Sequence, residues 1–166
     1  LLGSDGNDNI DGMAGMDFLV GGSDNDTLAG GTENDTIRGG DGDDSILGQD
    51  GNDVIHAGDG QDSVFGGNGN DTMTGGDGND FVQGQAGADI LLGGDGNDII
   101  GGGGGRDVLL GGDGDDTVNG NSGTDTLAGN QGSDRVANPT GADVIDEQFR
   151  LDAAIAIMLE TLAPSA

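Results

Sequence analysis

Several residue types are missing or scarce in this chain of 166 residues. It contains no Cys, Trp, Tyr or Lys, and its single His is His56. Without Cys there is no disulfide, and one imidazole without thiolates cannot build a zinc or copper site. No apolar run approaches the ~20 residues that cross a bilayer, so the sequence predicts no membrane span.

Positive charge is also scarce. Four Arg stand against 32 acidic residues, which gives a formal net charge of −28. Nucleic-acid phosphates and anionic membrane surfaces repel such a polyanion, so both classes of partner are excluded. Low hydrophobicity combined with high net charge is typical of disordered chains. We therefore expect this chain to fold only when cations are bound.

Glycine is abundant, with 39 residues, and it recurs with a strict period. From Gly3 to Asp146 the chain divides without insertion into sixteen consecutive nonapeptides, of which Gly75–Gln83 is a regular example. The eighth position is always apolar, from Ile10 through Met73 to Ile145. The sixth position is always aspartate: Asp8, Asp17, Asp26, Asp35, Asp44, Asp53, Asp62, Asp71, Asp80, Asp89, Asp98, Asp107, Asp116, Asp125, Asp134 and Asp143. A fixed period of this kind predicts a stack of repeats.

Each nonapeptide predicts a six-residue loop followed by a three-residue strand whose middle residue faces inward. Strands this short must stack on their equivalents eighteen residues away, which forms two parallel sheets around one apolar column. The expected fold is an all-β parallel solenoid over residues 1–146, with about eight coils that each rise ~4.8 Å. Leu1 and Leu2 fill the last two positions of an incomplete unit, so we expect a piece cut from a longer array.

Residues 147–166 depart from the repeat and predict one terminal helix. Residues 147–162 contain no Gly or Pro, Asp146 is a suitable N-cap, and Pro164 ends the segment. Either this helix caps the open end of the last coil, as solenoids require, or it covers an apolar patch on one sheet. The accessibility of Leu110 separates these alternatives. The apolar residues that share one face of the predicted helix are Leu151, Ile155, Met158, Leu159 and Leu162. The apolar patch on the sheet consists of Ile90, Leu92, Val108 and Leu110.

The ligand that completes the fold follows from the available donors. One obligate core side chain per nine residues buries too little apolar surface to offset the ordering of a Gly-rich chain. A ligand that binds only the folded form must supply the difference. Carboxylates and carbonyls on flexible loops suit Ca²⁺, which accepts about 6–8 oxygens in loose geometry, whereas Mg²⁺ demands a stricter octahedron.

The nonapeptide closely resembles the GGxGxDxUx repeat of the RTX (repeats-in-toxin) family, over about 144 of the 166 residues. This resemblance implies a parallel β-roll in a protein exported by type I secretion machinery, and therefore an extracellular or cell-surface location. It also implies that Ca²⁺ lies between the loops of successive coils, with the sixth-position Asp carboxylates as ligands. Asp80 would then share ions with Asp62 and Asp98. Eight loops on each edge leave seven gaps, so up to about 14 ions fit, and their charge would balance the formal −28.

Some units depart from the pattern, and we expect altered metal sites there. Asp24 and Glu33 replace Gly at the fourth position, where a left-handed backbone would suit Asp better than Glu. Ala88 and Arg106 occupy the fifth position of their units, and Asn138-Pro139 replaces the double glycine of the last loop.

Three functions remain open: a calcium-dependent folding module of a secreted bacterial protein, the repeat domain of a surface adhesin or ice-binding protein, and the accessory domain of a secreted hydrolase. Ice binding needs a regular rank of outward Thr, but only Thr32 and Thr140 occupy the third position. We expect no enzyme activity, since Ser122 and Ser133 have no His in register and the carboxylates are explained by the metal. His56 is predicted to be a solvated surface residue, and Phe65 and Phe81 to pack on the surface. The sequence leaves the oligomeric state open.

Overall fold

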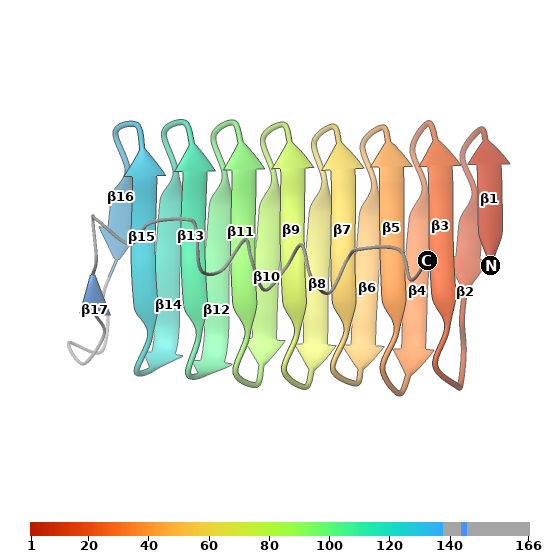
Figure 1. The fold of residues 1–166 in the computed structure, drawn as a ribbon, viewed down its shortest axis with the longest axis horizontal. Coiled ribbons are helices and arrows are strands. Elements are labelled where there is room, and N and C mark those ends of the chain that lie inside the picture. Colours follow the sequence, from red (N-terminus) through yellow and green to blue (C-terminus); the bar gives the residue numbers. More distant parts are fainter. Residues whose placement is uncertain (138–143, 146–166) are drawn as a thin grey trace, which may run out of the picture.

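The computed structural model describes residues 1–137 and 144–145. These residues form a flattened solenoid of two parallel sheets, between which the chain alternates at every strand (Figure 1). The all-β parallel roll expected from the sequence is confirmed. Within the described residues there is no helix, and hence none that could cross a membrane. The predicted terminal helix and its division from the roll lie outside the described part of the chain.

One sheet has nine strands and the other has eight. The nine-stranded sheet consists of β1 (Leu2–Asp5), β3 (Phe18–Ser23), β5 (Thr36–Asp41), β7 (Val54–Asp59), β9 (Thr72–Asp77), β11 (Ile90–Asp95), β13 (Val108–Asp113), β15 (Thr126–Gln131) and β17 (Val144–Ile145). The eight-stranded sheet consists of β2 (Asn9–Asp11), β4 (Thr27–Thr32), β6 (Ser45–Asp50), β8 (Ser63–Asn68), β10 (Phe81–Ala86), β12 (Ile99–Gly105), β14 (Thr117–Gly123) and β16 (Arg135–Ala137).

The register confirms a coil of two nonapeptides. In the pairing of β9 with β11, Met73 lies beside Leu91 and Thr74 beside Leu92. The same shift of eighteen residues recurs from pair to pair, as between Ile37 of β5 and Ile55 of β7. Every residue therefore stacks on the residue at the same position of the neighbouring coil.

The strands are longer than the three residues predicted. β9 continues from Thr72 through Gly75-Gly76 to Asp77, and Gly76 pairs with Gly94 of β11. The prediction was wrong because glycine pairs usually indicate loops, whereas in this stack each pair meets an identical backbone one coil away and extends the ladder. In most units only three residues remain as the connecting loop, for example residues 78–80.

The core is one side chain wide. The eighth-position residues from Leu19 to Leu127 are at most 1% exposed, and they form one continuous cluster that Ile10 and Val136 extend at its ends. Inward-facing side chains of both sheets meet in this single layer. Because no second layer exists inside the roll, the loops on its two edges lie close to the core and hold the sixth-position aspartates against it.

Candidate metal centre: two columns of aspartates

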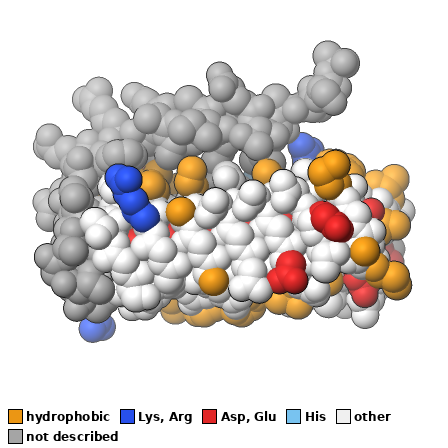
Figure 2. All heavy atoms as spheres, turned by 90° about the horizontal axis from the view of Figure 1, so that it is seen from below, with side chains coloured by type: hydrophobic (Ala, Val, Ile, Leu, Met, Phe, Trp, Pro, Cys, Tyr) orange, Lys and Arg blue, Asp and Glu red, His pale blue; other side chains and the backbone are white. Residues whose placement is uncertain are grey.

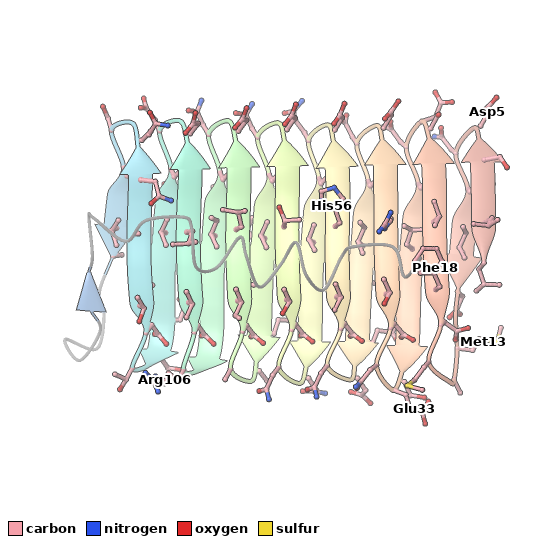
Figure 3. The ribbon with its side chains drawn as sticks, in the orientation of Figure 1. Asp5, Met13, Phe18, Glu33, His56 and Arg106 are labelled. Atoms are coloured by element: carbon pink, nitrogen blue, oxygen red, sulfur yellow. The ribbon has the colours of Figure 1, made fainter. Side chains whose placement is uncertain are left out.

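The sixth-position aspartates fall into two columns because each ends a loop between strands of opposite sheets. The first edge of the roll, after the odd-numbered strands, carries Asp8, Asp26, Asp44, Asp62, Asp80, Asp98, Asp116 and Asp134. The second edge, after the even-numbered strands, carries Asp17, Asp35, Asp53, Asp71, Asp89, Asp107 and Asp125. In Figure 3, Asp5 lies at the first edge, and Glu33 and Arg106 lie at the second. Asp143 is outside the described residues.

Interior members of both columns are buried although they are acidic. Their exposure is 1–3% for every aspartate from Asp26 to Asp125 in the two columns. The members nearest the ends, Asp8, Asp17 and Asp134, are half-buried. Burial of ionisable side chains at this density is rare in proteins unless they are paired or bound to metal.

One carboxylate oxygen of each aspartate links its coil to the preceding coil. The backbone N–H of Asp62 donates to Oδ1 of Asp80 at 2.9 Å, and the N–H of Asp80 donates to Oδ1 of Asp98 at 2.8 Å. The same bond repeats along the second edge, where the N–H of Asp71 donates to Oδ1 of Asp89 at 2.8 Å. These bonds fix the rotamer of every interior aspartate and thereby the direction of its second oxygen.

The second oxygen, Oδ2, is buried and has no hydrogen-bond partner among the described residues. This holds for Asp26, Asp35, Asp44, Asp53, Asp62, Asp71, Asp80, Asp89, Asp98, Asp107 and Asp116. A buried acceptor without a partner costs about 1–3 kcal/mol, and more when it is charged. Its recurrence at one position of every interior coil indicates a missing ligand rather than a packing fault.

A main-chain oxygen of the next coil converges with Oδ2. A Cβ placed on Gly93 would clash with Oδ2 of Asp98 and lie 2.6 Å from the carbonyl oxygen of Gly111. The same pair of oxygens surrounds Gly84, where they come from Asp89 and Gly102. The first-position glycine therefore leaves room for a site with oxygen donors from two coils, and the donors present fit a hard cation.

Nowhere in the described residues do three His, Cys, Asp or Glu side chains come together as a metal cluster. The neighbouring carboxylates of one column instead lie one coil apart along the edge. A cation between two coils would therefore take most of its ligands from backbone carbonyls. This donor set is typical of calcium sites and unlike the side-chain clusters that bind zinc.

The electrostatics of the columns oppose ionisation in the absence of a cation. Burial raises the pKa of Asp62, Asp71 and Asp98 from 3.8 to about 7. Burial likewise raises the pKa of Asp53 and Asp107 to about 6. The backbone N–H bond partly lowers each of these pKa values, and neighbouring carboxylates of the same column raise them again. A cation beside Oδ2 would remove this penalty.

The loops with an acid at the fourth position adopt the left-handed backbone expected from the sequence, with φ of 73° at Asp24 and 76° at Glu33. Their carboxylates bind the backbone of the preceding coil. The N–H of Gly15 donates to Oε2 of Glu33 at 2.7 Å, and the N–H of Gly6 donates to Oδ2 of Asp24 at 3.1 Å. Whether these loops hold altered metal sites stays a prediction, as it does for Asn138-Pro139 outside the described residues.

A second ladder, formed by the fifth position, was missed by the sequence analysis. The N–H of Asn52 donates to Oδ1 of Asn34, and the N–H of Asn70 donates to Oδ1 of Asn52, at 2.8 and 2.7 Å. These bonds run opposite to those of the aspartates, because here the earlier coil supplies the acceptor. The recurrence of Asn at this position in so many units was the signal that could have revealed the ladder.

Other residues singled out from the sequence lie on the outer faces. His56 of β7 is half-buried rather than fully solvated (Figure 3). Burial lowers its pKa, as does the charge of Arg38 on the adjacent strand, whereas Asp59 raises it. The rings of Phe65 and Phe81 pack together with centroids 5.6 Å apart, as predicted.

Comparison with known families agrees with this geometry. The family model described as the RTX calcium-binding nonapeptide repeat (4 copies) matches residues 2–37, 29–64, 38–73, 65–100 and 101–136. These matches together span the roll almost from end to end. A search of the curated proteins finds no match. The sequence period, the parallel roll and the family model together place this chain in the RTX calcium-binding nonapeptide repeat family.

Proposed function

We propose that the two aspartate columns hold rows of Ca²⁺, up to about 14 ions, and that these ions make the fold possible. The proposal rests on the unpartnered Oδ2 atoms of the aspartates from Asp26 to Asp116. Calcium supplies the positive charge that these oxygens lack. Each aspartate then joins its coil to the preceding coil through the N–H bond to Oδ1, and to the next coil through the ion at Oδ2.

Interior and terminal aspartates would contribute differently. Asp80 has a coil on either side, so its carboxylate borders two gaps, whereas Asp8 lies in the first complete unit and is half-buried. Filling one gap holds its two coils at a fixed spacing, which also prepares the adjacent gap for the next ion. Binding is therefore expected to be cooperative along each edge, as folding is in stacked repeats.

The biological role follows from the concentration of calcium. Sites of extracellular modules bind at about 10⁻⁴–10⁻³ M and stay empty in the cytosol. A chain that folds only outside the cell can pass a type I secretion channel unfolded and fold on exit. We therefore propose that the chain is the calcium-folded repeat module of a secreted bacterial protein.

Circular dichroism with and without calcium tests the proposal. In EGTA at neutral pH the chain should give the signal of an unfolded polypeptide, and millimolar Ca²⁺ should produce β signal cooperatively. Mg²⁺ at the same concentration should not replace it. A chain that keeps its full β signal in EGTA at neutral pH would refute calcium-dependent folding.

A matched pair of variants locates the sites. Asp80→Asn removes one charge from a buried carboxylate, and Asp77→Asn removes one from an exposed carboxylate three residues earlier. Equilibrium dialysis should find fewer tightly bound ions in Asp80→Asn and an unchanged number in Asp77→Asn. Equal stoichiometry in both variants would contradict sixth-position ligation.

A further inference from the structure

The outer face of the nine-stranded sheet contains an apolar strip that does not belong to the core between the sheets. We define the outer strip as the ninth-position residues of β9, β11, β13 and β15, namely Thr74, Leu92, Leu110 and Ala128. Leu110 is 1% exposed, Ala128 is 0% exposed and Thr74 is 7% exposed. Leu110 and Ala128 form a second apolar cluster, against which the partly buried Leu92 packs.

The opposite sheet gives a direct contrast at the equivalent position. Leu47 is the ninth-position residue of its unit on β6, and it is 37% exposed. Phe81 and Ile99, which also face outward on that sheet, are 37% and 53% exposed. An outward leucine on a single sheet stays accessible unless another layer covers it. The burial of Leu110 therefore requires a third layer on this face.

The length of the outer strip restricts which segment of the chain can cover it. Toward the N-terminal end, the ninth position becomes polar at His56 and Arg38, which are only half-buried. The four strands of the strip extend over about 19 Å at ~4.8 Å per strand. A helix formed by residues 147–162 would be about 24 Å long at 1.5 Å per residue. Such a helix is long enough to cover the strip and to reach the neighbouring strand β7.

The C-terminal segment also starts at the right place. β17 pairs with β15, so the segment begins at the end of the sheet that carries the strip. Its sequence places Leu151, Ile155 and Met158 on one helical face. Glu160, near its far end, would come toward the basic side chain of Arg38. Apolar pattern, length and charge all agree with this one occupant.

We propose that residues 147–162 form an amphipathic helix that lies along the outer strip of β9–β15, rather than over the open end of the last coil. The helix closes the apolar face of the sheet as a third layer. The roll is thus held by calcium on its edges and by apolar packing on one face.

Thiol labelling tests this arrangement in the chain of 166 residues, which has no cysteine of its own. Leu110→Cys and Leu47→Cys place one thiol at equivalent positions of the two sheets. At saturating Ca²⁺, with the β signal confirmed, Leu110→Cys should react with a maleimide at least about tenfold more slowly than Leu47→Cys. If Leu110→Cys does not fold, Ala128→Cys and Ala29→Cys provide the same comparison with a smaller change.

A second substitution identifies the covering segment. Adding Ile155→Asp to Leu110→Cys should raise the labelling rate to that of Leu47→Cys, because the charge falls on the apolar face. Ala153→Asp, on the opposite helical face, should leave the rate unchanged. Rapid labelling of Leu110→Cys alone would overturn the proposal. So would protection that Ile155→Asp does not affect, or protection that disappears on dilution, which would assign the cover to a second copy of the chain.

Discussion

On the first edge, the third position is Asp in five consecutive odd-numbered strands, ending at Asp41, Asp59, Asp77, Asp95 and Asp113, and all five are exposed. On the second edge, only Asp50 is acidic at this position, and Asn68, Ala86, Gly104 and Ser122 follow it. Figure 2 views the roll from the second edge, where few acidic side chains reach the surface. The buried aspartates are common to both edges, so the edges differ mainly in the charge outside them.

The second edge also departs from the repeat in its backbone. Gln49, Gln85 and Asn121 replace its second glycine and adopt φ of 81°, 79° and 67°. The Asn ladder stops at Ala88, whose N–H still donates to Asn70 but whose side chain offers no oxygen to the next coil. Arg106 then places a positive charge in the following loop. The fold of this edge therefore does not depend on outer acids, and we expect the outer acids of the first edge to attract cations to that edge.

We expect the first edge to fill at lower calcium concentration than the second. The largest effects should nevertheless be common to both edges. Asp80→Ala on the first edge and Asp89→Ala on the second each remove a buried carboxylate and leave one backbone N–H of the preceding coil without its acceptor. Each should lower the free energy of unfolding in Ca²⁺ by about 3 kcal/mol or more.

Chemical denaturation at fixed calcium measures this loss. Asp8→Ala is the control, because Asp8 is half-buried and borders only one complete gap. Its loss should be less than half as large. Equal losses at Asp8 and Asp80 would contradict the shared ions, and a large difference between Asp80 and Asp89 would contradict the equivalence of the two buried columns.

The next prediction concerns the pH dependence of folding, and it applies to both edges. Asp62 on the first edge and Asp71 on the second have pKa values raised to about 7 by burial. Because the pKa is raised in the folded state, protonation of these carboxyls stabilises the calcium-free fold. This stabilisation is complete below the unfolded-state pKa of about 3.9 and is lost as pH rises through about 7. In EGTA, β signal should therefore increase as pH is lowered from 8 toward 4.

Calcium reverses this dependence because it binds the deprotonated carboxylates and releases their protons. The Ca²⁺ concentration at half-folding should rise as pH falls from 8 to 6. Titrations followed by circular dichroism at each pH measure both trends. A midpoint independent of pH would show that the buried aspartates do not exchange protons for the ion.

A smaller effect should separate the edges directly. Asp77→Asn together with Asp95→Asn removes two exposed charges beside the first column, and Ala86→Asp adds one beside the second. Exposed charges contribute about 0.2–1 kcal/mol each, so the loss of two should weaken the tighter class of sites by roughly two- to thirtyfold, and the added charge should tighten the weaker class. Calorimetric titration measures the affinity of each class separately. The change in affinity that the substitutions cause should become smaller at high salt. If the calcium affinities of the two classes of sites do not change, the outer acids have no role in calcium binding.

The smallest effect is expected at Arg106, the fifth-position cation of the second edge. Arg106→Asn removes an exposed positive charge and restores the residue type that forms the ladder in the earlier coils of this edge. Affinity of the weaker class should rise by less than about threefold. Arg135→Asn, a cation on the outer face of β16, is the control and should leave the affinity unchanged. A decrease at Arg106→Asn would indicate that its side chain supports the loop.

The stacking of the eighth-position residues, such as Leu91, and of the sixth-position aspartates, such as Asp80, is predicted correctly from the sequence. Each column depends on a single residue that recurs at the same position of every unit. Prediction from the sequence fails for Gly75-Gly76, since local preference for a loop is overridden by stacking on an identical backbone. It also fails for His56, whose burial depends on neighbours from other coils. The difference between the edges is visible only when alternate units are compared, because successive units lie on opposite sides of the roll.

The N–H bonds that link each aspartate to the coil before it also determine how the roll would respond to tension. They lie in series along the solenoid axis, each joining two coils. A pull on the two ends would peel off the terminal coil first, and each coil would release eighteen residues, or roughly 60 Å of extended chain. In a stretching experiment with calcium, the molecule should lengthen in regular steps of this size, one coil at a time.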